Sequence, residues 1–201
     1  MQRLIEGYRR FRAGQWPERR ATFEALAHHG QSPPAAVIAC SDSRVDPAMI
    51  FSAAPGDLFV VRNVANLVPA YAPDQRAHAT SAAIEFAVRG LEVSDLVVMG
   101  HAMCGGIRAL LEGAPHPVGD FLGPWMEIAE PAKRKALACE PAERQAACER
   151  EAVKLSLENL STFPWIAERM AGGRLQLHGA IFDIRSGVLS ILQADGGFAA
   201  A

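Results

Sequence analysis

The chain has 201 residues, of which 50% are hydrophobic and 21% are charged, and its net charge is −2. This is the composition of an ordinary globular protein, and the length suits one domain over residues 1–201 with a sizeable core. A nearly neutral chain offers no overall field for nucleic acid or for an anionic membrane, so neither is expected as a partner.

The first residues lack an apolar stretch of signal-peptide length, and no later segment is apolar for long enough to span a bilayer. We therefore expect a cytoplasmic location. In that reducing compartment, the four cysteines favour metal binding or catalysis over a disulfide framework.

Residues 4–26 combine charged positions with regularly spaced apolar ones, which predicts two amphipathic helices broken around residues 14–17. They lie within an N-terminal helical arm, residues 1–30. Such an arm packs either on a neighbouring subunit or on its own domain, and the helical pattern alone leaves both arrangements open.

Strand and helix patterns alternate along the next part of the chain. Short apolar runs predict buried strands over residues 35–39, 58–61 and 95–99, and helical spacing predicts helices over 80–91 and 105–111. The polar, Ala-, Glu- and Arg-rich composition of residues 118–170 predicts a helical stretch. The pattern of residues 175–192 predicts two strands joined at Ser186 and Gly187. The expected fold is therefore α/β, with a mostly parallel central β-sheet flanked by helices.

Two clusters of chemically active side chains follow two of the predicted strands. Cys40 ends the first apolar run, and His101 and Cys104 come after the third. Ligands gather beyond the carboxyl ends of parallel strands where the strand order reverses, so we expect these residues to meet. Two thiols and one imidazole supply three zinc ligands and leave one position open, as catalytic zinc sites do. Cys104 also begins a predicted helix, whose free N–H groups and dipole favour the thiolate that binds metal.

Each ligand taken alone has a simpler interpretation. Cys40 could be a small buried hydrophobe, and His101 could be a hydrogen-bonded histidine at a strand end. Their combination with Cys104 at two equivalent junctions favours a zinc site. Cys139 and Cys148 have no nearby histidine and no Cys-x-x-Cys spacing, so we interpret them as packing or surface thiols.

Four segments carry a recognisable pattern in a fixed order. They are Cys40–Val45 (CSDSRV), Val61–Asn66 (VRNVAN), Gly100–Gly106 (GHAMCGG) and Leu177–Asp183 (LHGAIFD). These segments resemble the signature segments of the β-class carbonic anhydrases. The resemblance implies that Cys40, His101 and Cys104 hold a zinc ion and that Asp42 and Arg44 form a catalytic pair.

The resemblance also implies a reaction and an assembly. The reaction is the reversible hydration of CO2 to bicarbonate and a proton through a zinc-bound hydroxide, because zinc lowers the pKa of its water. Asp42 would accept a hydrogen bond from the hydroxide, and Arg44 would hold the Asp42 carboxylate. The assembly is an obligate homodimer, sometimes paired into a higher homo-oligomer, with active sites near the dimer interface. A turn cap at Asp42 and an ordinary ion pair at Arg44 are the plainer alternatives.

Residues around the pocket divide the family into groups. The plant-like group has a glutamine and a phenylalanine where Gln31 and Phe59 stand, and the other group has a tryptophan and a glycine where this chain has Val37 and Ala39. We therefore favour the plant-like group and take Gln31, Phe59 and Gly105 as candidate substrate-binding residues. Two positions depart from the plant-like pattern: Phe86 replaces a common tyrosine, and Asp46 replaces a common cysteine.

The sequence leaves alternative functions open. A related scaffold could hydrolyse carbon disulfide or carbonyl sulfide, and a zinc-binding sensor without turnover is a third interpretation. The presence of Asp42 and Arg44 argues against the sensor, because a structural zinc site needs no such pair. Arg62 could contact an anion or form a structural ion pair.

Overall fold

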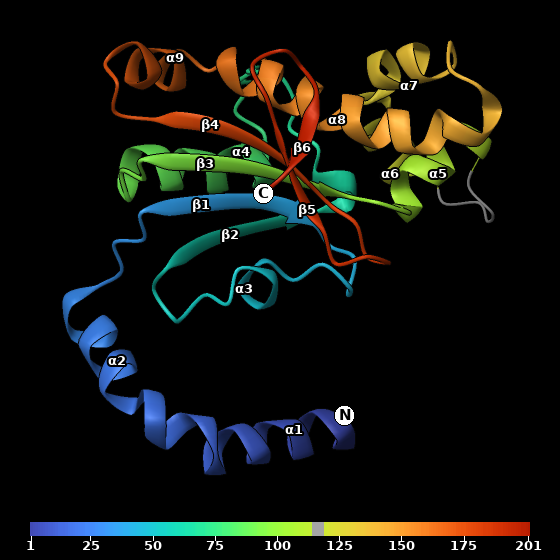
Figure 1. Cartoon of the computed structure of the whole chain (residues 1–201). Helices are drawn as coiled ribbons and strands as arrows, with labels where there is room; N and C mark the ends of the chain where they lie inside the picture. The colour runs from blue at the N-terminus through green and yellow to red at the C-terminus, as the bar shows by residue number, and fades with distance from the viewer. Residues whose placement is uncertain (114–118) are drawn as a thin grey trace.

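A six-stranded sheet forms the centre of the protein in the computed structural model, which describes residues 1–113 and 119–201 (Figure 1). The strand order is β2-β1-β3-β4-β5-β6. The first four strands run parallel, and β5 and β6 are added antiparallel at one edge. The strands are β1 (Ala35–Cys40), β2 (Leu58–Asn63), β3 (Asp95–His101), β4 (Gln176–Phe182), β5 (Leu189–Leu192) and β6 (Phe198–Ala200). The predicted α/β fold with a mostly parallel sheet is confirmed.

Helices connect the strands and cover the sheet. They are α1 (Gln2–Ala13), α2 (Gln15–His29), α3 (Pro47–Ile50), α4 (Ala79–Glu85), α5 (Gly105–Glu112), α6 (Leu122–Glu127), α7 (Glu130–Ala136), α8 (Arg144–Ser161) and α9 (Pro164–Ala171). Short 3₁₀ turns lie at Val64–Asn66 and Pro141–Glu143. Val118, where the predicted helical stretch begins, lies outside the described residues.

The strand β1 reads Ala-Ala-Val-Ile-Ala-Cys and is buried on both faces, as expected for a central parallel strand. On one face, Ala36 and Ile38 pack with residues of α4, α8 and α9. On the other face, Val37 and Ala39 pack with Ile50 of α3 and with β5. The core therefore continues on both sides of the strand that carries Cys40.

Two short elements and one helix end differ from the sequence prediction. The strand β6 and the helix α3 were not predicted, because elements of three or four residues are too short to show periodicity. The helix predicted over residues 80–91 is α4 followed by a wider π-helical turn, Phe86–Gly90, in which Leu91 N donates to Phe86 O.

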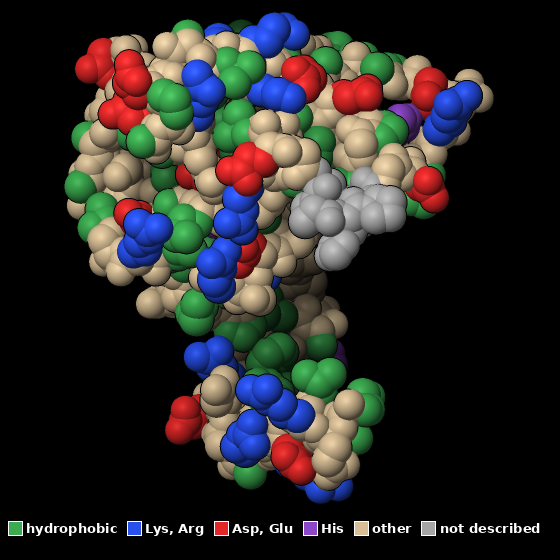
Figure 2. Space-filling model, turned by 90° about the vertical axis from the view of Figure 1, so that its right-hand side faces the viewer, with side chains coloured by type: hydrophobic (Ala, Val, Ile, Leu, Met, Phe, Trp, Pro, Cys, Tyr) green, Lys and Arg blue, Asp and Glu red, His purple; other side chains and the backbone are tan. Residues whose placement is uncertain are grey.

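The N-terminal arm stands apart from the sheet domain (Figures 1 and 2). Its two helices break at Gly14, within the predicted interval, and Phe11, Trp16 and Phe23 stack on one another at 5.1–6.4 Å between ring centroids. Neither helix has a buried residue. Leu26 packs against Gly56 of the sheet domain, but Leu4 and Tyr8 of the arm stay exposed. Among the described helices, none combines the length and the apolar character needed to cross a membrane.

Candidate metal centre

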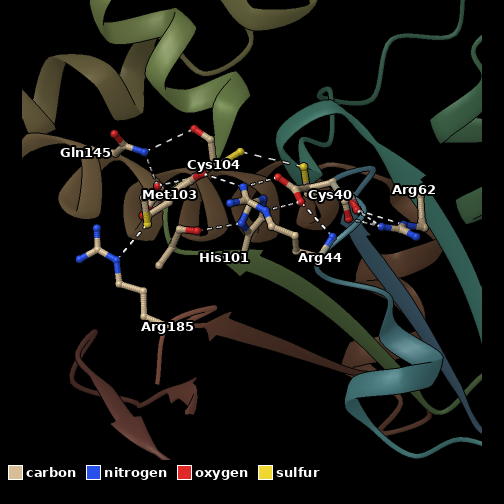
Figure 3. A network of polar contacts seen from close by, with 11 residues as sticks. Cys40, Arg44, Arg62, His101, Met103, Cys104, Gln145 and Arg185 are labelled. Carbon is tan, nitrogen blue, oxygen red and sulfur yellow. Dashed lines mark hydrogen bonds and ion pairs between the residues drawn. The ribbon is translucent and has the colours of Figure 1, made fainter. Parts of the chain in front are cut away.

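Two neighbouring strand ends bring three metal-binding side chains together (Figure 3). Cys40 is the last residue of β1, His101 is the last residue of β3, and Cys104 caps the N-terminus of α5. The strand order reverses between β1 and β3, because β2 lies on the far side of β1. The ligand atoms of the three residues all lie within 4.8 Å of one another, and all three residues are buried. The expected meeting of the two clusters is therefore observed.

The orientation of the His101 ring fits a metal ligand. Its Nδ1 lies 2.9 Å from the Ala102 carbonyl oxygen, which accepts a hydrogen bond when Nδ1 carries the proton. Its Nε2 is buried and has no hydrogen-bond partner among the described residues. A buried polar atom without a partner is costly, so this nitrogen needs a ligand.

The two sulfur atoms also fit a zinc site. Cys40 Sγ and Cys104 Sγ are 4.0 Å apart. Two thiolates bound to one tetrahedral zinc at about 2.3 Å each would lie roughly 3.8 Å apart. Two cysteine sulfurs and one histidine nitrogen are a donor set that zinc accepts, so the residues present fit this metal.

The contact between the two thiols opposes the expected effect of the helix start on Cys104. The hydrogen bond with Cys104 lowers the pKa of Cys40 to about 4, and the same contact raises the pKa of Cys104 well above its usual range. Two thiolates in contact repel each other, so in the absence of a cation the pair favours one thiol and one thiolate, and the N–H groups of Gly106 and Ile107 lower the pKa of Cys104. The start of a helix alone does not make Cys104 a thiolate, and a cation between the sulfurs would.

Asp42 and Arg44 lie next to the cluster and bind each other. Arg44 donates from Nε to Asp42 Oδ1 at 2.9 Å and from Nη2 to Oδ2 at 2.7 Å, and its backbone N–H donates to Oδ1 at 3.0 Å. These bonds hold the pKa of Asp42 well below its usual range. Arg44 Nη2 also donates to the Met103 carbonyl oxygen at 3.3 Å, which links the Asp42 loop to the turn before Cys104. The Asp42 carboxylate is not among the ligand atoms of the cluster.

Arg62 holds the loop that carries Asp42. From the end of β2 it donates to the Cys40 carbonyl oxygen through Nε at 3.0 Å and Nη2 at 2.9 Å, and to the Asp42 carbonyl oxygen at 2.6 Å. It also pairs with Asp46 at 3.2 Å, and Asp46 accepts from Met49 N to cap α3. Of the two interpretations left open, these contacts support the structural one.

Two residues of the site escaped the sequence analysis. Glu149 Oε1 accepts a hydrogen bond from the Cys104 backbone N–H at 2.9 Å, and Gln145 Nε2 donates to the same oxygen at 3.0 Å. Burial raises the pKa of the Glu149 carboxyl, and the hydrogen bonds from Gln145 and Cys104 counteract this rise. One signal was available in the sequence: Glu149 lies between Cys148 and Ala152 on the buried stripe of α8, where an acidic residue is unusual.

The candidate pocket residues are dispersed in a single chain. Gly105 follows Cys104 directly, and a Cβ added there would meet nothing within 4 Å. Phe59 lies near the start of β2 and packs on Phe86, with 5.8 Å between ring centroids. Asn63, not Phe59, pairs with Cys40, which places Phe59 about 13 Å back along the strand. Gln31 precedes β1 and so lies at the opposite end of that strand from Cys40.

Comparison with known proteins identifies the family. The family model described as carbonic anhydrase matches residues 35–189. The chain is also 40% identical over 195 residues to a carbonic anhydrase of Pseudomonas aeruginosa, covering 96% of this chain and 87% of that protein. The chain belongs to the β-carbonic anhydrase family. The prediction that it is an enzyme, a carbonic anhydrase, is thereby confirmed.

Further relatives agree with this assignment. Beta carbonic anhydrase 3 of Arabidopsis thaliana is 33% identical, covering 97% of this chain and 78% of that protein. The structure of the β-carbonic anhydrase CcaA superposes with a TM-score of 0.93 at 36% identity, covering 100% of this chain and 99% of that one. A tetrameric β-carbonic anhydrase of Sordaria macrospora has a TM-score of 0.82 at 30% identity, covering 99% and 98%. Because a bacterial protein matches at least as well as the plant protein, these similarities do not single out the plant-like group.

Proposed function

We propose that this carbonic anhydrase catalyses the reversible hydration of CO2 to bicarbonate and a proton, with zinc held by Cys40, His101 and Cys104. The observation that carries the proposal is the buried His101 Nε2, which has no partner in the described chain and lies with both thiol sulfurs inside a 4.8 Å cluster. Zinc bound there would lower the pKa of a coordinated water and so supply a nucleophile near neutral pH.

Asp42 and Arg44 are proposed to orient the reacting water. Arg44 occupies both carboxylate oxygens of Asp42, so the carboxylate stays ionised and fixed in direction. In that position it accepts the hydrogen bond of the reacting water and turns the lone pair of that water toward CO2. Since the Asp42 oxygens lie outside the ligand cluster, we propose that the fourth metal position stays open to water and substrate.

The chain is proposed to act as a homodimer or a larger homo-oligomer. The arm has no buried residue, and Val60 and Phe86 are exposed apolar side chains of the sheet domain. Phe59 and Gln31 lie away from the metal cluster of their own chain. If they bind substrate, they do so in the site of a partner subunit, and the arm packs on that partner. The tetrameric Sordaria macrospora relative supports such an assembly.

Membership of the plant-like group is also a proposal. Val37 and Ala39 occupy the positions of the other group's tryptophan and glycine, and both are buried in the sheet beside β3. That group's bicarbonate-regulated inhibition is therefore not expected in this chain. As bicarbonate is added at fixed pH and ionic strength, a fall in net CO2 hydration no larger than the reverse reaction accounts for would support the proposal.

Stopped-flow CO2 hydration by zinc-loaded protein tests the proposed reaction, with carbon disulfide as the comparison substrate. Rapid hydration that is lost on zinc removal and restored by zinc is the expected result. Turnover of carbon disulfide alone would favour the hydrolase alternative. Bound zinc with turnover of neither substrate would favour the sensor.

A further inference from the structure

The turn that carries Cys104 is conformationally strained. Met103, the residue before it, has a φ of 60°, in the left-handed region that a residue with a Cβ seldom adopts. Such a conformation is energetically unfavourable, so the turn persists only when its neighbours hold it. The position of one proposed zinc ligand therefore depends on contacts made outside its own segment.

Arg44 bonds to the Met103 carbonyl of this turn, and the contacts to the Cys104 backbone come from one face of α8. Glu149 Oε1 accepts from the Cys104 N–H at 2.9 Å, and Gln145 Nε2 lies 3.4 Å from the Cys104 carbonyl oxygen. Gln145 Nε2 also donates to Glu149 Oε1 at 3.0 Å, so the two side chains support each other. Residues four apart lie on the same face of a helix, and these two meet both backbone polar groups of Cys104 from that face.

The chemical identity of Glu149 makes an ordinary packing role a poor explanation. Glu149 is only 5% exposed, and within the described chain no lysine or arginine pairs with it. Its buried neighbours on α8 include Ala152 and Val153, which need no partner. A buried carboxylate without a cation costs stability unless strong donors satisfy it. The donors here are the Cys104 backbone and Gln145.

We infer that Glu149 and Gln145 are positioning residues that hold the Cys104 backbone and so place its sulfur for metal binding. This inference rests on the proposed zinc site and concerns how firmly one ligand is held. Groups that orient a metal ligand typically change metal affinity by about 10–100-fold when they are removed.

The test measures the zinc dissociation constant of the full chain by competition with a chromophoric chelator. Glu149→Ala is expected to weaken zinc binding by about 10–100-fold. Glu149→Gln keeps an oxygen that can accept from the Cys104 N–H, so it is expected to stay close to wild type. Gln145→Ala is expected to weaken binding in the same direction but by less. In the cobalt-substituted protein, the thiolate-to-cobalt absorption of Glu149→Ala should shift in energy or intensity.

Ser156→Ala is the matched control. Ser156 is buried on the same helix and bonds to Asn66 O and Val68 N, away from Cys104. Its loss should lower stability without changing zinc affinity.

Three results would overturn the inference: wild-type zinc affinity in both alanine variants, a loss no greater than that of Ser156→Ala, or an equal loss in Glu149→Gln and Glu149→Ala. If Glu149→Ala does not fold, the zinc affinities of Gln145→Ala and Glu149→Gln decide whether the positioning role holds. Failure of the wild-type chain to bind zinc would instead refute the proposed function.

Discussion

Arg44 holds Asp42 by both carboxylate oxygens, through side-chain hydrogen bonds of 2.9 and 2.7 Å. The same guanidinium reaches the Met103 carbonyl oxygen, so one side chain connects the loop after β1 with the turn after β3. The three proposed metal ligands lie in or next to these two segments. The arginine is therefore placed to control the direction of the carboxylate without contributing a ligand.

Replacing Arg44 tests this relationship. Arg44→Ala should lose most CO2 hydration activity while it retains zinc, because Asp42 loses its orientation and the ligands are untouched. Arg44→Lys should recover only part of the activity, since a single ammonium cannot bond both oxygens. The measurements are stopped-flow hydration and zinc content per chain. Full hydration by Arg44→Ala would contradict the proposed role.

The depressed pKa of Asp42 predicts how stability depends on pH. A carboxyl whose pKa is lower in the folded state stabilises the fold above its unfolded pKa, here 3.8, and loses that contribution as pH falls through the folded value. The free energy of unfolding of wild type should therefore exceed that of Asp42→Asn by a constant amount above about pH 5. The difference should shrink below about pH 4. Urea denaturation over this range measures it, and a difference that narrows near neutral pH would argue against the ion pair.

The ligand set predicts which cysteines matter for zinc. Cys40→Ser, Cys104→Ser and His101→Ala should each greatly reduce zinc content, because each removes one of three protein ligands. Cys148→Ala and Cys139→Ser should keep one zinc per chain. Cys148 makes a good control, because it is as buried as the ligands but lies in the packed face of α8. Zinc loss in Cys148→Ala alone would point to a different ligand set.

Arg62 is expected to matter for stability through the loop that it holds. Arg62→Ala removes the side-chain donor to the Cys40 and Asp42 carbonyl oxygens, of which Asp42 O keeps the Val45 N–H, and it should reduce the free energy of unfolding by about 1–3 kcal/mol. Asp46→Asn keeps these backbone contacts and should cost less. Chemical denaturation of both variants provides the comparison. Equal losses would assign the effect to the ion pair instead of the backbone contacts.

The arm is expected to hold subunits together. Leu4 and Tyr8 are 71% and 61% exposed and lie one turn apart on α1, so changing both to aspartate should disrupt an arm that packs on a partner. The expected result is a lower molar mass by light scattering. Gln2→Ala with Glu6→Ala, on the opposite face of the helix, should leave the mass unchanged. An unchanged mass in the Leu4 and Tyr8 variant would count against the arm as an interface.

Much of this site was predictable because it depends on short segments. Cys40, Asp42 and Arg44 lie within five residues, and His101 and Cys104 lie within four. Apolar runs ending at each segment predicted the strands, and the carboxyl ends of parallel strands share one edge of a sheet. The ligand types, the metal they suit and the family all followed from these local patterns.

Relationships between distant segments could not be predicted in this way. Periodicity shows which face of a helix is buried but not what that face meets, so Glu149, 45 positions from Cys104, was missed. For the same reason, the separation of Gln31 and Phe59 from the metal cluster became visible only in the folded chain. The sequence by itself determined the family and the proposed ligands, because those depend on residue type and local spacing. The tertiary structure decided that His101 Nε2 is buried without a hydrogen-bond partner among the described residues, that Arg44 bonds to both carboxylate oxygens of Asp42, and that α8 contacts Cys104. These features depend on how separate elements pack.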